Sequence, residues 1–203
     1  LELKREIVTG SADSNENILD FLTPVEAASV GGFILGSFPA KQIGAIKDDE
    51  IRGAILQTIG KLSLADLMTV VPPTKAEKLA KLAEDAFVDV MDPPSYETLL
   101  KLGTFSLFIG DKIKEATADT LRKFLLTGFE WRVGKAVCLP DDLAHTWADV
   151  VVKAFGEPAT WDEEAIYDIG DFLVTVAETD HLFDIPIPAF RNTAHHLVQN
   201  SGF

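Results

Sequence analysis

The stretch LLKLGTFSLFIG, Leu99–Gly110, places Gly103 inside an apolar run with the character of a helix, and Phe105 follows two residues later. A glycine in a helix interior costs about 1 kcal/mol relative to alanine. We expect it where a neighbouring helix approaches too closely for a side chain, or where the helix bends around the core. Close approach predicts that Gly103→Leu lowers the melting temperature, because the added side chain overpacks the contact.

The same pattern occurs twice more in the chain. Gly31 lies in SVGGFILGSFPAKQIGAI and Gly170 lies in DIGDFLVTVAETDHLFDI. Each of the three glycines follows an aliphatic residue and precedes a phenylalanine by two positions. We take these glycines and phenylalanines as the structural marks of a repeat: Gly31, Phe33, Gly103, Phe105, Gly170 and Phe172.

The register continues beyond the glycines. Apolar residues lie 12, 15 and 20 positions after Gly31 and after Gly170, and two positions earlier after Gly103, as a two-residue deletion in a loop would produce. Further on, IRGAILQTI from Ile51 matches LRKFLLTGF from Leu121, and EDAF ending at Phe87 matches VKAF ending at Phe155. This predicts a unit of about 67–72 residues, built of helical hairpins and repeated two to three times, as in a stacked helical solenoid.

Helix signals dominate the chain. Thr23 with Glu26, Thr74 with Glu77 and Thr160 with Glu163 have the spacing of capping boxes, and apolar residues recur at intervals of three and four behind them. No alternating strand pattern stands out. We therefore predict an all-α protein of short helices, with residues 1–20 as a polar N-terminal segment or linker and residues 21–203 as a single helical repeat domain.

Charge and hydropathy restrict the partners. The formal net charge is −14, which disfavours nucleic acid and anionic membranes as partners. The twelve acidic residues from Asp141 to Asp184, against Lys153 alone, predict a solvated face. The longest uncharged stretch, Ala27–Ala40, has fourteen residues and is too short for a membrane-spanning helix, so we expect no transmembrane segment.

No residue pattern predicts a catalytic, metal or cofactor site. DSNENILD, Asp13–Asp20, begins like a calcium loop, but Ile18 and Pro24 stand where that loop needs glycine and glutamate. His195 and His196 diverge by about 100° on a helix and cannot share one metal. Cys138 has no base that spacing places beside it, and Glu163 and Glu164 point to different sides of a helix. We expect no enzyme activity and no cofactor.

Residues 112–135 form the most basic segment of this acidic chain. Arginine and tryptophan are common at the energetic centres of protein interfaces. The alternative is a solvated face with a tryptophan in the core. The candidate partner-binding residues are Arg122, Lys123, Trp131, Arg132 and Lys135.

The passage Pro93–Gly128 resembles the repeat of the mesothelin, stereocilin and otoancorin family. A proline-led helix enters a leucine–glycine pair, and an apolar helix, an acidic turn and a second helix with spaced leucines follow. The matching residues are Pro94, Leu99, Leu102, Gly103, Leu107, Asp111, Ile113, Leu121 and Leu125. TWDEEAIYDIGDFL, around Trp161 and Gly170, is similar to another frequent opening of that repeat, and the likeness extends from Leu22 to Leu197.

The resemblance implies a right-handed superhelix of short helices, at the cell surface or in an extracellular gel, that serves adhesion rather than catalysis. Its partner would be a protein, a glycoprotein or copies of itself in an assembly. A cytoplasmic scaffold of the HEAT or armadillo kind is the alternative, although those repeats have about 40–47 residues. A ligand carrier or enzyme with a pocket between repeats is the second alternative.

Overall fold

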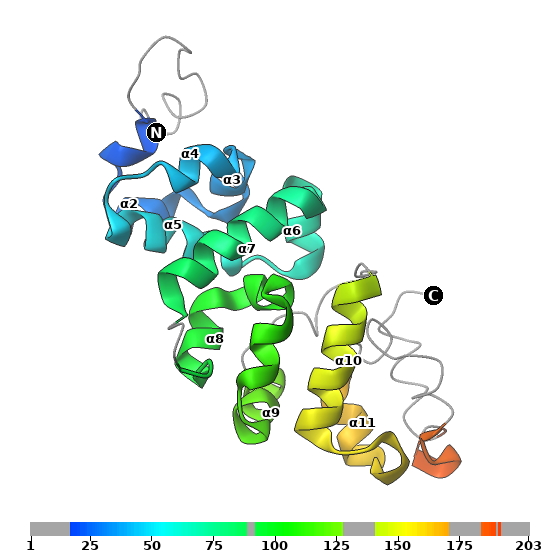
Figure 1. The fold of residues 1–203 in the computed structure, drawn as a ribbon. Coiled ribbons are helices and arrows are strands. Elements are labelled where there is room, and N and C mark those ends of the chain that lie inside the picture. The colour runs from blue at the N-terminus through cyan, green and yellow to red at the C-terminus, as the bar shows by residue number, and fades with distance from the viewer. Residues whose placement is uncertain (1–16, 89–91, 128–140, 171–183, 190, 192–203) are drawn as a thin grey trace.

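Every regular element in the described part of the chain is a helix, which confirms the predicted all-α class. The computed structural model describes residues 17–88, 92–127, 141–170, 184–189 and 191. The helices follow one another from η1 and α2 at one end of the molecule to α10 and α11 at the other (Figure 1). They are η1 (Ile18–Phe21), α2 (Pro24–Val30), α3 (Gly32–Ser37), α4 (Ala40–Gly44), α5 (Asp49–Gly60), α6 (Leu64–Val70), α7 (Pro73–Phe87), α8 (Tyr96–Leu102), η2 (Gly103–Phe108), η3 (Gly110–Glu115), α9 (Ala118–Thr127), α10 (Asp141–Phe155), η5 (Pro158–Thr160) and α11 (Glu163–Ile169).

The three marked glycines end helices instead of lying inside them. Helices α2, α8 and α11 have seven residues each and stop directly before Gly31, Gly103 and Gly170. These glycines have φ values of +90°, +55° and +59°, in a region that L side chains rarely adopt. The expectation of one helix running through Gly103 is therefore wrong, because α8 ends there and the chain continues as the 3-10 helix η2.

The same three helices also begin alike. A side-chain oxygen eight residues before each glycine caps the helix: Thr23 accepts from the Glu26 N–H, Ser95 from the Thr98 N–H and Asp162 from the Ala165 N–H. At α2 the capping box is complete, because Glu26 Oε2 accepts from the Thr23 N–H at 2.8 Å. The capping box predicted at Thr23 is thus confirmed.

The two other predicted caps are wrong. Helix α7 begins at Pro73, with Pro72 in the capping position and no side-chain hydrogen bond, so Thr74 lies inside the first turn. A proline suits the first helical position and starts the helix earlier than the threonine suggests. At α11 the capping residue is Asp162, whereas the Thr160 hydroxyl donates to the Glu157 carbonyl in η5 at 2.7 Å.

Because Asp162 and not Thr160 caps α11, substitutions at these two residues are expected to lower the free energy of unfolding by different amounts. Asp162→Ala is expected to lower the free energy of unfolding by about 1 kcal/mol, because the Ala165 N–H loses its acceptor, 2.9 Å away. Thr160→Ala is expected to change it by less than about 0.5 kcal/mol. Urea unfolding followed by circular dichroism measures both values. A larger loss for Thr160→Ala would show that the cap of α11 is misassigned.

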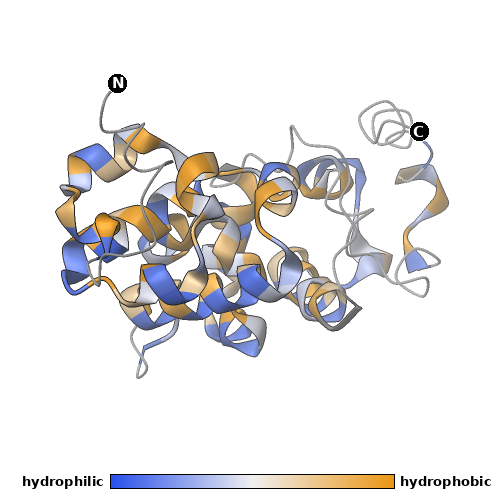
Figure 2. Ribbon diagram, turned by 90° about the horizontal axis from the view of Figure 1, so that it is seen from above, coloured by the Kyte–Doolittle hydropathy of each residue, from blue (hydrophilic) through white to orange (hydrophobic). Residues whose placement is uncertain are grey.

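The longer helices pack in corresponding ways after Gly31 and after Gly103. α5 lies against α2, α7 and α8, and α9 lies against α8, α10 and α11. α7 and α10 have fifteen residues each and end at Phe87 and Phe155, the two residues at which the sequence match ends. The interior contains most of the residues that carry the family resemblance: Leu99, Leu102, Leu107, Ile113, Leu121 and Leu125 are all buried. Hydrophobic and hydrophilic residues share each of the longer helices (Figure 2).

At Gly103 the backbone touches a preceding helix. A Cβ at this position would overlap the Gly60 carbonyl group at the end of α5 and lie 2.7 Å from its carbon. The adjacent Thr104 hydroxyl donates to the Leu62 carbonyl just beyond α5. The predicted close approach is therefore present at Gly103. It is absent at Gly31, where a Cβ would meet no atom within 4 Å.

The two marked phenylalanines in the described residues differ in exposure. Phe105 is fully buried, with its ring beside Gly60, whereas 48% of Phe33 is exposed. Phe172 lies outside the described residues. The same sequence position thus packs against α5 in one case and faces solvent in the other.

Candidate functional site

Helix α9 positions the two candidate partner-binding residues that the structure describes. Consecutive helical residues diverge by about 100°, so Arg122 and Lys123 point to different neighbours. The Arg122 guanidinium carbon is 5.4 Å from the centroid of the Phe155 ring, and its Nη2 is 3.9 Å from Asp168 Oδ2. Lys123 Nζ is 4.0 Å from the centroid of the Tyr96 ring. Trp131, Arg132 and Lys135 lie outside the described residues.

These contacts connect α9 with three neighbouring helices. The residues that make them are here called the α9 surface: Tyr96 of α8, Arg122 and Lys123 of α9, Phe155 of α10, and Asp168 of α11. An exposed cation over an aromatic ring contributes about 0.5–1 kcal/mol, and an exposed ion pair contributes no more than about 1 kcal/mol. Each of these three contacts is weak. A partner can therefore replace them at small cost.

The other described cations of the basic segment are paired within the chain. Lys112 Nζ is 2.5 Å from Glu115 Oε2. Lys114 Nζ lies 2.6 Å from Asp149 Oδ2 and 3.0 Å from Asp111 Oδ1. Hydrogen bonds to Asp149 and then to Asp111 raise the pKa of Lys114 above its usual range. These ion pairs neutralise the charges of Lys112 and Lys114 locally.

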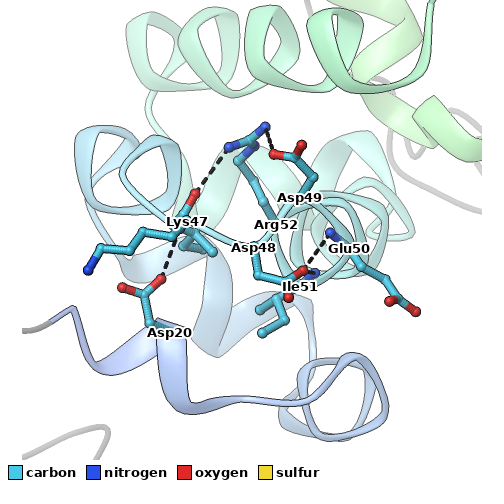
Figure 3. A network of polar contacts seen from close by, with 8 residues as sticks. Asp20, Lys47, Asp48, Asp49, Glu50, Ile51 and Arg52 are labelled. Atoms are coloured by element: carbon cyan, nitrogen blue, oxygen red, sulfur yellow. Dashed lines mark hydrogen bonds and ion pairs between the residues drawn. The ribbon is translucent and has the colours of Figure 1, made fainter.

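The part of the calcium-like segment that the structure describes ties η1 to the helices that follow. Asn17 Nδ2 donates to the Gln42 carbonyl at 2.7 Å, and the Lys47 N–H donates to Asp20 Oδ1 at 3.0 Å. Figure 3 shows the Asp20 carboxylate directed at the Lys47 backbone, while Asp48 caps α5. The Asn17 and Asp20 side chains therefore hold η1 against the helices that follow. Asp13 and Asn15 lie outside the described residues.

The remaining candidates do not converge on a site. In the described residues, no group of three His, Cys, Asp or Glu side chains lies close enough together to hold a metal ion. His145 is exposed on α10, and Glu163 and Glu164 are exposed in the first turn of α11. Cys138, His195 and His196 lie outside the described residues.

Most described acidic side chains of the acidic segment have the predicted solvated character, whereas Asp168, beside Arg122, is half-buried. Asp149, Glu157, Asp162, Glu163, Glu164 and Asp184 are all exposed. In the described ranges of the chain, no helix combines the length and the apolar character that crossing a bilayer requires. Comparison with protein-family models, with curated proteins and with solved structures finds no match to this chain.

Proposed function

We propose that the chain is a non-enzymatic, extracellular structural or adhesion module, which binds another macromolecule through an extended surface of stacked helical repeats. The observation that carries the proposal is the recurrence of one local design, a capped seven-residue helix ending at a glycine with positive φ, at Gly31, Gly103 and Gly170. In solenoids such recurrence builds continuous surfaces that serve as binding sites.

The packing supports a stack with a unit of about 67–72 residues. α5 contacts α8, the first helix of the next unit, and α9 likewise contacts α11. The family resemblance adds a right-handed superhelix and a place at the cell surface or in an extracellular gel. From the known members of that family we infer a protein or glycoprotein partner.

Within this proposal the α9 surface is the binding site. It combines an arginine with two half-buried aromatic rings, Tyr96 and Phe155, and Tyr167 is exposed next to Asp168 in the sequence. Interface centres favour arginine and aromatic side chains, which bring large contact areas at small cost in conformational entropy.

Site-specific photocrosslinking tests the proposal. A benzophenone amino acid replaces Asp119, exposed in the first turn of α9, and in a control protein it replaces Asp66, exposed in the first turn of α6. Extracellular and cytosolic fractions of the source tissue are irradiated with each protein. We expect an adduct with an extracellular protein from position 119, and none from position 66.

A double substitution supplies the quantitative test. Arg122→Ala with Lys123→Ala is expected to weaken binding of the crosslinked partner by about 30-fold or more, as loss of an interface hot spot does. Its effect on the free energy of unfolding should stay within about 3 kcal/mol, the sum of the two cation–π contacts and the exposed ion pair that it removes. Adducts that form only with cytosolic proteins would instead favour the intracellular scaffold.

A further inference from the structure

We draw no further inference here: the strongest candidate, the surface patch of apolar side chains exposed on α2 and α3 around Val25 and Phe33, carries nothing because the described part of the chain does not show what covers it.

Discussion

Gly103→Ala is expected to lower the free energy of unfolding by about 2–6 kcal/mol, because two separate costs add at this residue. The first is conformational: φ is +55° and ψ is −131°, a combination that an alanine adopts only with strain of about 1–3 kcal/mol. The second is steric. The new methyl group would overlap the Gly60 carbonyl group, so the end of α5 must move away, at about 1–3 kcal/mol.

Gly31→Ala separates these two costs. Gly31 also ends a seven-residue helix and has φ of +90°, but a Cβ there would meet no atom within 4 Å. Only the conformational cost applies, so we expect a loss of about 1–3 kcal/mol. Denaturant unfolding of both variants gives the comparison. Equal losses would show that the contact between Gly103 and Gly60 contributes nothing to stability, and a neutral Gly103→Ala would refute the helix end as well.

Trp147→Ala is expected to cost about 3–5 kcal/mol of unfolding free energy, the range typical of a large side chain removed from a core. Trp147 is fully buried on α10, and its Nε1–H donates to the Leu107 carbonyl of η2 at 3.1 Å. The substitution creates a cavity between α10 and η2, and it also leaves a buried carbonyl without this donor. The measurement is again the free energy of unfolding in urea.

Two variants control for the cause of this loss. Trp147→Phe keeps most of the volume and removes only the donor, so a loss of about 1–3 kcal/mol is expected. Tyr167→Ala removes an aromatic side chain that is 66% exposed, and we expect a loss below about 1 kcal/mol. If Trp147→Ala cost no more than Tyr167→Ala, the packing of α10 on η2 described above would be incorrect.

The sequence located three equivalent positions, but it predicted glycines inside helices where the structure has helix ends. Gly31, Gly103 and Gly170 were recognised by their shared surroundings, and each marks the end of a helix. The end itself was missed at Gly103 because burial continues across it: Phe105 and Leu107 in η2 are as buried as Leu99 and Leu102 in α8. Apolar spacing reports which side chains face the core, and here it does not distinguish an α-helix from a 3-10 helix that follows it.

Capping was predictable only where a single residue could supply it. Thr23 stands alone before its helix and caps it, whereas Thr160 competes with Asp162, whose carboxylate lies closer to the free N–H groups of α11. At Thr74 the competing factor is a proline at the first helical position. Local spacing alone does not rank such neighbours.

The sequence predicts the two cations of the α9 surface, but it does not predict which aromatic rings lie beside them. Arg122 and Lys123 stand out in the sequence as bases in an acidic chain. Their aromatic neighbours, Phe155 and Tyr96, come from other helices, so only the packing of α8, α9 and α10 brings them together. The difference between Phe33 and Phe105 likewise depends on which helix lies over each ring, and no local pattern records that.

The central claim is that successive helical units stack through the contact between the end of α5 and the turn after α8. The most direct measurement is a nuclear Overhauser effect between the α-protons of Gly60 and Gly103 in the complete, isotope-labelled chain. A Cβ on Gly103 would lie 3.4 Å from Gly60 Cα, so the account predicts a clear cross-peak between these protons. Assigned resonances for both glycines without such a cross-peak would contradict the stacking.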